Sequence, residues 1–254
     1  MMEVKTDMQT IPKILHYCWF GKGEKSKLIQ FCISTWEKIL PDYQIIEWNE
    51  DNFDLNLAPA YVKQAYECRK YAFVSDYARI QVLCNLGGVY LDTDVEAVKS
   101  INDILDNETF VSGFVTDKLL TAAFIATVPH HPFLAEFLKT YQTRDFQLAD
   151  GQMDITPIND HLTMLAEKYG LKTDDSLQMV QSDMKIYPVE YFTGYDMDNS
   201  HIKKTENTYM IHHMMGTWLE LSFSKTLKLS VKKMLIKIMG HDRFDRFNNG
   251  RKRS

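Results

Sequence analysis

Residues 75–94 read SDYARIQVLCNLGGVYLDTD, and this stretch holds the strongest signals for the fold. Its first part has the length and apolar content of a helix, and Gly87 suits a C-cap in the left-handed conformation. The apolar run 89–91 then predicts a buried strand that opens directly into Asp92 and Asp94. Ligands of open α/β sheets bind at the carboxyl ends of strands, so the two aspartates stand where a functional site is expected.

The segments before this stretch complete the start of an α/β domain. Residues 13–19 (KILHYCW) and 43–48 (YQIIEW) predict buried strands, and residues 26–40 between them have apolar positions at helical spacing. Strand, helix and strand at this spacing indicate a mostly parallel, Rossmann-type sheet flanked by helices. The remaining predicted helices are 59–72, 73–86, 132–141 and 159–169, and the remaining predicted strands are 109–115, 122–128 and 208–213.

The composition is that of one soluble domain. The chain has 254 residues, of which 45% are hydrophobic and 25% charged, and no linker divides it into equal parts. The N-terminus is polar and no apolar run approaches the roughly 18 residues that span a bilayer, so a cytoplasmic location is expected. The four cysteines are widely spaced, which indicates neither a zinc site nor a disulfide framework.

The charge is unevenly distributed along the chain. The formal net charge is -5, yet residues 225–254 hold ten Lys and Arg against two acids. An acidic body argues against general nucleic-acid binding. Residues 225–238 place apolar side chains on one helical stripe and lysines elsewhere, which predicts a basic amphipathic helix. We therefore expect a main domain at 1–222 and a basic helix and tail at 223–254, in which residues 223–240 either bind the inner face of an anionic membrane or pack on the domain.

The aspartate pair has the chemistry of a cation site. In an extended chain Asp92 and Asp94 point to the same side, so both can face one divalent cation and one diphosphate. Carboxylate oxygens suit Mg²⁺ or Mn²⁺. A polar surface turn is the alternative for so short a motif. Two enzyme classes use such a pair: phosphatases of the haloacid dehalogenase type, in which the motif usually follows the first strand, and metal-dependent glycosyltransferases with nucleotide-sugar donors.

Two further groups of residues bear on this choice. Asp76 and Arg79 are three residues apart and share a helix face, as a functional pair or as a surface ion pair. Near the end, YMIHHMMGTW (209–218) sets two adjacent histidines after an apolar strand. Alternation sends His212 and His213 to opposite faces, so only one is expected to bind a metal, and the strand register favours His212.

At this point the sequence resembles a known family. The stretch 75–94 is similar to the signature of glycosyltransferase family 32, which groups yeast initiating mannosyltransferases with bacterial capsular polysaccharide transferases and is distantly like clostridial glucosylating toxins. Residues 11–23 (IPKILHYCWFGKG) resemble the opening strand of that family, and 209–218 resemble its His…Gly-Ser-Trp ending, with Thr217 where serine is commoner. The likeness covers roughly residues 11–100 and 209–218.

The resemblance implies a GT-A-like fold with a nucleotide-sugar-binding half at 11–100 and an acceptor-side region at 101–222. Asp94 would bind the metal directly, Asp92 would hold the ribose and a metal-bound water, and one late histidine would be the third protein ligand. The implied catalytic residues are Arg79, Asp92, Asp94 and Trp218, the implied donor-binding residues are Tyr17, Trp19, Asp76, Arg79, Tyr90, Asp92 and Thr217, and the candidate metal ligands are Asp92, Asp94, His212 and His213. Trp19 would stack on the base, with a buried core tryptophan as the alternative.

The function implied is metal-dependent transfer of a hexose with retention of configuration. The donor would be a nucleotide sugar, UDP-linked by expectation, with Mn²⁺ or Mg²⁺. The acceptor would be a glycan or lipid-linked oligosaccharide in capsular or similar polysaccharide biosynthesis, and residues 150–163 are expected on the acceptor side. Three alternatives stay open: a haloacid dehalogenase-like phosphatase, a nucleotide-sugar-binding protein without turnover, and a toxin-like transferase that acts on protein.

Overall fold

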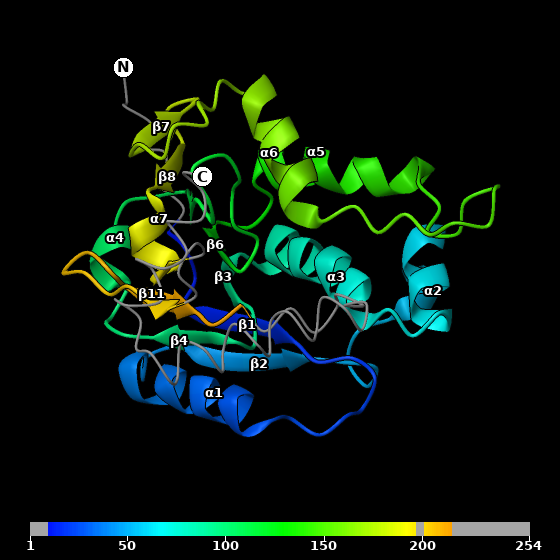
Figure 1. The fold of residues 1–254 in the computed structure, drawn as a ribbon, viewed down its shortest axis with the longest axis horizontal. Helices are drawn as coiled ribbons and strands as arrows, with labels where there is room; N and C mark the ends of the chain where they lie inside the picture. Colours follow the sequence, from blue (N-terminus) through cyan, green and yellow to red (C-terminus); the bar gives the residue numbers. More distant parts are fainter. Residues whose placement is uncertain (1–9, 197–200, 215–254) are drawn as a thin grey trace, which may run out of the picture.

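A computed structural model describes residues 10–196 and 201–214. Its centre is a seven-stranded sheet in the order β2-β1-β3-β6-β5-β8-β7 (Figure 1). The strands are β1 Ile14–Cys18, β2 Gln44–Trp48, β3 Gly88–Leu91, β5 Phe110–Gly113, β6 Phe124–Thr127, β7 Gln178–Val180 and β8 Met184–Tyr187. The pairings β1–β2, β1–β3 and β5–β8 are parallel, whereas β3–β6, β5–β6 and β7–β8 are antiparallel. Five strands therefore point the same way, which confirms the mostly parallel sheet.

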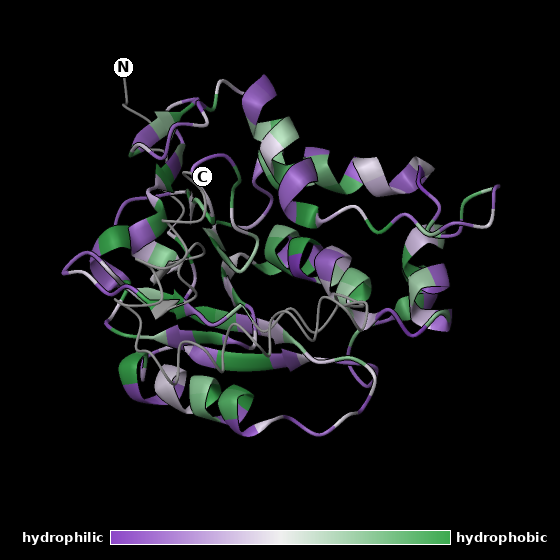
Figure 2. Cartoon of the chain, in the orientation of Figure 1, coloured by the Kyte–Doolittle hydropathy of each residue, from purple (hydrophilic) through white to green (hydrophobic). Residues whose placement is uncertain are grey.

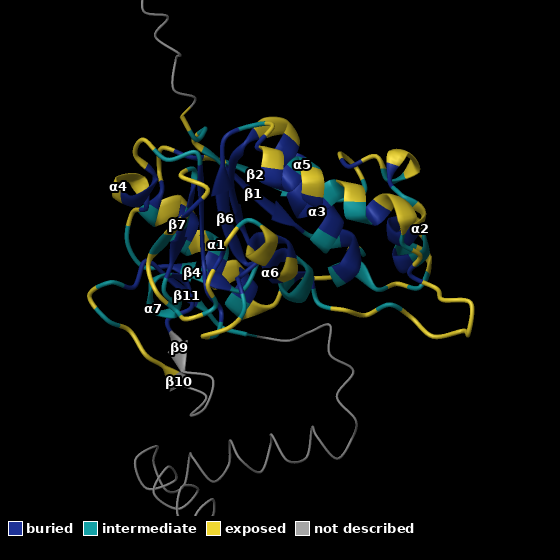
Figure 3. Ribbon diagram, turned by 90° about the horizontal axis from the view of Figure 1, so that it is seen from above, coloured by how far each residue is buried: buried dark blue, intermediate teal, exposed yellow. Residues whose placement is uncertain are grey.

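Helices cover both faces of this sheet. One core cluster joins α1 (Lys27–Ile39) to β1 and β3 through Trp36, Leu15 and Val89. The other packs α2 (Ala60–Glu67), α3 (Tyr71–Leu86), α5 (Pro132–Lys139) and α6 (Ile158–Lys168) over the opposite face. Figure 2 shows apolar positions along the strands and on the helices that face them, and Figure 3 shows buried strands and a buried α3 beneath the more exposed α5 and α6. The fold is thus a three-layer α/β domain.

Helix α1 forms as its sequence predicts. The Ser26 side chain accepts a hydrogen bond from the Ile29 amide and caps the N-terminus. Ile29, Cys32 and Trp36 are buried on one face, and the Trp36 indole N–H donates to the Val95 carbonyl at 2.7 Å. The helix therefore attaches the first crossover to the segment that follows the aspartates.

The turn between α3 and β3 requires its two glycines. Gly87 has φ +64 and Gly88 has φ +97, and the Gly87 amide donates to the Leu83 carbonyl at 2.8 Å. A Cβ on Gly88 would lie 2.5 Å from the Ile14 carbonyl oxygen, so β3 approaches β1 more closely than a side chain allows. The glycine pair thereby sets the exit direction of β3 and the position of the aspartates.

Several short elements were not predicted. Strand β4 (Val95–Ala97) resumes directly after the aspartates and pairs antiparallel with β11 (Met210–His212) in a separate two-stranded sheet. The strands β7 and β8 of the central sheet were not predicted either. The other unpredicted elements are η1 Leu55–Leu57, α4 Asn102–Leu105, η2 Thr140–Thr143, α7 Val189–Phe192, β9 Tyr195–Asp196 and β10 His201–Ile202. The β4–β11 pair matters most for function, because it carries the late histidines to the end of β3.

Part of the predicted machinery lies outside the described residues. This applies to Thr217 and Trp218, to the domain boundary at 222 and to the basic helix at 223–240. Within the described ranges, no helix combines the length and the apolar character needed to cross a membrane.

Candidate active site

The two aspartates lie in a turn at the carboxyl end of β3. The Val95 amide donates to the Asp92 carbonyl at 3.0 Å, and the Asp92 amide donates to the Ala123 carbonyl at 3.0 Å. The two carboxylates face one point as predicted, but not through the alternation of an extended chain, since β3 ends at Leu91 and the backbone turns between the two residues. The carboxylates converge because of the turn, and β4 begins immediately after it.

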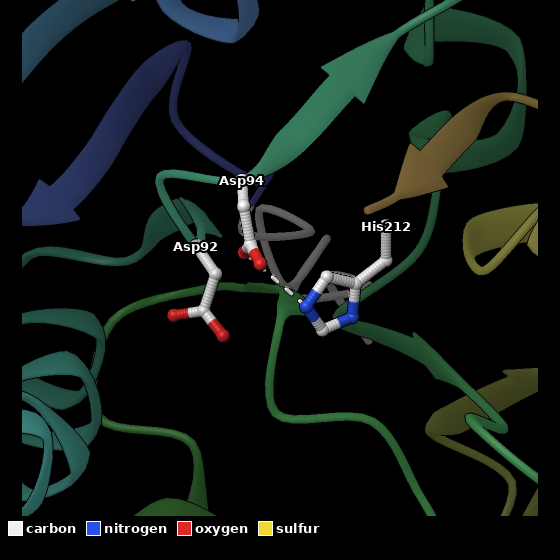
Figure 4. A group of neighbouring side chains, drawn as sticks. All are labelled: Asp92, Asp94 and His212. Atoms are coloured by element: carbon white, nitrogen blue, oxygen red, sulfur yellow. Dashed lines mark ion pairs between the residues drawn. The ribbon is translucent and has the colours of Figure 1, made fainter. Parts of the chain in front are cut away.

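His212 joins this pair from a distant part of the chain. One ligand atom each from Asp92, Asp94 and His212 lies within 4.8 Å of the other two. The Nε2 atom of His212 is 3.2 Å from an Asp94 oxygen, and Figure 4 shows these two side chains pointing at one another with Asp92 beside them. In the antiparallel register of β4 and β11, His212 faces Val95, one residue after Asp94. This register explains why His212 lies next to Asp94.

His212 is electrostatically coupled to Asp94. Burial disfavours its imidazolium, but the hydrogen bond and the charge of Asp94 outweigh burial and raise the pKa of His212. Its Nδ1 atom is buried and lacks a hydrogen-bond partner among the described residues. A carboxylate pair with one imidazole nitrogen is a donor set that suits Mn²⁺ or Mg²⁺ and leaves further coordination positions open for phosphate oxygens. These residues therefore fit a divalent cation.

His213 takes the opposite direction, as alternation predicts. Its Nε2 atom lies 3.0 Å from a Glu96 oxygen, and its backbone N–H donates to the Asp94 carbonyl at 2.9 Å. The structure therefore brings His212, and not His213, to the aspartate pair.

Arg79 links the aspartate turn to helix α3. Its Nη2 atom is 2.8 Å from Asp76 and its Nη1 atom is 3.0 Å from Asp92, and Nη1 also donates to the Ala122 carbonyl at 2.9 Å. The guanidinium lies 4.7 Å from the centre of the Tyr90 ring, and the residue is only 5% exposed. At least three oxygens and the Tyr90 ring thus fix the position of the guanidinium and compensate its charge.

The carboxylate and the phenol around Arg79 are also buried. Burial raises the pKa of Asp76 to about 6, against the opposing charge of Arg79. The Tyr90 side chain is 1% exposed and its hydroxyl donates to Asp92 at 3.0 Å. Four of the predicted residues therefore form one continuous network, in which Arg79 and Tyr90 are buried and Asp76 and Asp92 are partly buried.

Trp19 and Tyr17 stand apart from that network. Trp19 is half-buried just after β1, its indole N–H donates to the Gly23 carbonyl at 2.7 Å, and the Lys25 ammonium lies 5.4 Å from its ring centre. Tyr17 is buried against Trp36, and its hydroxyl donates to Glu47 at 2.5 Å. The structure gives Tyr17 a packing role beneath α1, and leaves Trp19 at the carboxyl edge of the sheet.

A second polar group lies beside α3. Its residues Asp154 and Asn159 fall in the segment 150–163 that is expected on the acceptor side, whereas Arg144 was not predicted. Arg144 forms an ion pair with Asp154 at 2.7 Å, and the positive charge of Arg144 reaches Asp76. From α6, Asn159 accepts the Ala122 amide N–H at 3.1 Å, next to the carbonyl that Arg79 holds. The contact between Asn159 and Ala122 joins residues 37 apart in the sequence, so no local spacing signals it.

A cavity of about 670 Å³ lies beside the loop after β2 and the helix α2. Glu50 lines it, and one oxygen of this carboxylate accepts the Gly21 amide N–H at 2.7 Å. Its other lining residues are Asp51, Asn52, Phe53, Asp54, Leu55, Asn56, Lys63, Tyr66 and Glu67, and none of the residues predicted for the metal site is among them. The cavity and the cation site are therefore separate features.

Residues 26–111 match the model of the glycosyltransferase sugar-binding region containing a DXD motif. This range runs from the N-terminus of α1 through α3, the glycine turn and the aspartate pair to the start of β5. The predicted resemblance to DXD-containing glycosyltransferases is thereby confirmed.

Curated relatives are similar over about half of the chain. It is 27% identical over 138 residues to inositol phosphoceramide mannosyltransferase 1 of Schizosaccharomyces pombe, which covers 50% of this chain and 42% of that protein. It is 25% identical over 143 residues to mannosyl phosphorylinositol ceramide synthase CSH1 of Saccharomyces cerevisiae, and this alignment covers 52% of this chain and 35% of that protein. The chain thus spans less than half the length of these relatives.

A solved structure gives the fold. The PaToxG glycosyltransferase superposes with a TM-score of 0.50 at 20% identity, over 63% of this chain and 70% of that one. This likeness confirms the predicted GT-A-like α/β fold.

Proposed function

We propose that this chain is a metal-dependent glycosyltransferase that moves a hexose from a nucleotide sugar to an acceptor hydroxyl. One observation carries the proposal: ligand atoms of Asp92, Asp94 and His212 meet within 4.8 Å inside a fold of glycosyltransferases, beside a buried arginine. The match to a DXD-containing sugar-binding region supports the donor class.

Asp94 and His212 are proposed as direct ligands of Mn²⁺ or Mg²⁺, with Asp92 as a further ligand or the holder of a metal-bound water. When bound, the cation neutralises negative charge that develops on the departing nucleotide diphosphate. His212 must give up its proton to bind a metal, and its hydrogen bond to Asp94 is exchanged for ligation by both side chains. Metal affinity should therefore rise with pH across the titration of His212.

Arg79 is proposed to stabilise the same leaving group from the other side. It is buried and its guanidinium is fixed in position by Asp76, Asp92 and the Ala122 carbonyl, so its charge is already in place when the charge of the leaving group develops. Asp76 is proposed to accept hydrogen bonds from sugar hydroxyls. Its pKa of about 6 leaves it ionised at neutral pH, as this role requires.

The remaining parts are proposed from the resemblance. Trp19 would stack on the base, which we take as uracil, and Thr217 and Trp218 would contact the leaving phosphate. Transfer would proceed with retention, and the acceptor would be a glycan or lipid-linked glycan. The names of the yeast relatives add phosphoinositol-bearing lipids to the acceptors worth testing. We further propose a cytoplasmic protein that reaches the inner membrane face through residues 223–240.

The phosphatase alternative finds little support in the site. In that chemistry the first aspartate attacks phosphorus, but Asp92 accepts the Tyr90 hydroxyl and pairs with Arg79 through the same oxygen. The motif also follows the third strand along the chain, rather than the first. A protein that binds nucleotide sugars without turnover is separated from an enzyme by the experiment below.

The test is release of UDP or GDP from a panel of nucleotide sugars with Mn²⁺ present. We expect one donor to be turned over by the wild type, and expect Asp94→Asn to abolish release. Asp106→Asn is the matched control, because Asp106 is exposed and lies outside the site. Full activity of Asp94→Asn would contradict the proposal, and so would the absence of both turnover and binding for every donor. Binding without turnover would favour the non-catalytic alternative.

A further inference from the structure

The segment just before β6 is buried and is bound through its backbone from two sides. It consists of Leu120, Thr121, Ala122 and Ala123, and none of these residues is more than 4% exposed. We call residues 120–123 the connecting segment. The side chains of Ala122 and Ala123 are single methyl groups, so the position of this part of the chain depends on the partners of its peptide groups.

Groups of the candidate active site bind two carbonyls of the connecting segment. The Nη1 atom of Arg79 donates to the Ala122 carbonyl at 2.9 Å. The backbone N–H of Asp92, where the aspartate turn begins, donates to the Ala123 carbonyl at 3.0 Å. The connecting segment therefore supplies one oxygen that orients the arginine and one that fixes the turn.

Helix α6 binds two amides of the same segment. The Oδ1 atom of Asn159 accepts the Ala122 N–H at 3.1 Å, and the Oγ1 atom of Thr163 accepts the Leu120 N–H at 2.9 Å. The Thr163 hydroxyl also donates to the Asn159 carbonyl at 2.7 Å. Since Asn159 and Thr163 are four residues apart, they share one face of α6 and hold the connecting segment together.

The Asn159 side chain is used for this contact and not for its own helix. An asparagine at the start of a helix commonly caps it by accepting a backbone N–H of the first turn. In α6 the N-cap residue is Pro157, which makes no side-chain capping bond, and the oxygen of Asn159 binds a residue 37 positions away. Capping therefore does not explain the contact.

Ala122 is the residue at which the two sets of contacts meet. Its N–H is bound by Asn159 and its carbonyl is bound by Arg79. A buried backbone N–H without an acceptor is costly, so an Ala122 amide that lost the Asn159 oxygen would turn toward another acceptor. The Ala122 carbonyl belongs to the same short stretch of backbone and would change direction with it. The position of Arg79 thus depends on a side chain of α6.

We propose that Asn159, supported by Thr163, is a positioning residue of the active site, which holds the Ala122 peptide so that its carbonyl orients Arg79. That Arg79 serves sugar transfer rests on the proposed function, but the coupling between Asn159 and Arg79 does not. Asn159 acts on the reaction through Arg79, and the helix that follows the acceptor-side segment is thereby connected to the donor site.

The coupling is tested first, without donor or metal. In the full chain with ¹⁵N label, NMR follows the guanidinium of Arg79 and hydrogen exchange of the Ala122 amide. Asn159→Leu keeps the approximate size of the side chain but has no acceptor, so the Ala122 amide should exchange at least about 10-fold faster. The Nη1 resonance of Arg79 should shift, and rotation about the Cζ–Nη1 bond should become faster, because its hydrogen bond to the carbonyl is misaligned.

Conservative and remote variants serve as controls. Asn159→Asp keeps an acceptor oxygen and should leave the Arg79 resonance close to that of the wild type. Glu167→Leu introduces the same leucine at an exposed position of α6 and should change neither signal. Thr163→Val removes the hydroxyl that binds both Asn159 and Leu120 and should shift the Arg79 resonance, whereas Thr163→Ser should not.

The Arg79 resonance decides the proposal. An Arg79 signal in Asn159→Leu that matches the wild type would overturn it, because the contact would then only stabilise the fold. Equal shifts in Asn159→Leu and Glu167→Leu would overturn it as well. If Asn159→Leu does not fold, the Thr163 pair decides in its place, and equal Arg79 signals in Thr163→Val and Thr163→Ser overturn the proposal.

Transfer kinetics then connect the coupling with the reaction. Charge on the leaving group is greatest in the transition state, so a displaced Arg79 should lower kcat more than it raises KM for the donor. We expect Asn159→Leu to lower kcat about 10-fold and Asn159→Asp to recover most of this loss. Rates are measured at a temperature at which circular dichroism shows every variant folded, so that a residue important only for stability would leave kcat unchanged.

The positioning role and the proposed function fail separately. If the wild type turns over no donor, the proposed function is rejected, while a shifted Arg79 resonance in Asn159→Leu still supports the coupling. If the wild type turns over a donor and kcat is equal in Asn159→Leu and Glu167→Leu, the proposed function stands and the positioning role of Asn159 is overturned.

Discussion

Replacement of Arg79 by methionine removes the cation that pairs with the partly buried carboxylates of Asp76 and Asp92. Arg79 contacts Asp76 at 2.8 Å and Asp92 at 3.0 Å, and the side chains of Arg79 and Asp76 are 6% and 14% exposed. Methionine fills a similar volume without charge. The variant therefore leaves carboxylates in a buried environment that no longer compensates them.

The magnitude follows from this geometry. Removing one partner of a buried ion pair costs about 3–5 kcal/mol, because the remaining charge is desolvated and unpaired. For a domain of this size each kcal/mol lowers Tm by about 2–4 °C, so Arg79→Met should melt about 6–20 °C below the wild type at pH 7.5. At pH 5 the loss should be smaller, because Asp76 can then be protonated at lower cost.

The assay is urea and thermal unfolding of Arg79→Met, Asp76→Asn and the double variant. Residues in direct contact are not additive, so the double variant should lose less stability than the two single variants together. A loss below about 1 kcal/mol for Arg79→Met would match an exposed ion pair and refute the buried network. Strict additivity would refute the direct coupling of Arg79 and Asp76.

Three further outcomes are expected. Gly88→Ala should lower the free energy of unfolding in urea by more than about 1 kcal/mol, because a Cβ at φ +97 would lie 2.5 Å from the Ile14 carbonyl oxygen. Gly23→Ala is the control, because the space around its Cβ is open and its stability should change little. Equal effects of the two substitutions would contradict the close approach of β3 to β1. Burial raises the pKa of Asp76 to about 6, so ionisation of this carboxyl destabilises the folded state. The free energy of unfolding of the wild type, relative to that of Asp76→Asn, should therefore fall as pH rises from about 4 to 6 and level off above pH 6. A difference independent of pH would show that Asp76 titrates normally. Truncation after residue 222 should abolish sedimentation with anionic liposomes, and undiminished binding would reject the membrane role of residues 223–240.

Much of the fold could be predicted from local sequence patterns. The helix α3, the glycine turn and the strand β3 were predictable, because the apolar run and the glycines act within twenty residues of each other. The i, i+3 pair of Asp76 and Arg79 was predictable for the same reason. By contrast, the antiparallel direction of β6 leaves no trace in its sequence, since FIAT is equally apolar in a parallel or antiparallel sheet.

Contacts between distant segments set the limit of prediction. The contact of His212 with Asp94 depends on β4, a strand of three residues that is too short for its alternation around Glu96 to predict a strand. Alternation separated His212 from His213 correctly. It also predicted that the two aspartate carboxylates face one point, which they do, although they converge through a turn and not along an extended strand. The contact between Asn159 and the Ala122 amide left no signal, since it forms only when α6 packs beside the segment before β6.

Binding of Mn²⁺ in the presence of UDP tests the central claim most directly. Electron paramagnetic resonance at pH 8 measures free Mn²⁺ for the wild type, His212→Ala and His213→Ala. We predict one tight Mn²⁺ site in the wild type and near wild-type Mn²⁺ affinity in His213→Ala. In His212→Ala the Mn²⁺ affinity should be at least ~10-fold weaker, since even the loss of a residue that only hydrogen-bonds to a metal ligand costs that much. Equal affinity in all three proteins, or weaker binding in His213→Ala than in His212→Ala, would contradict a cation site built by Asp92, Asp94 and His212.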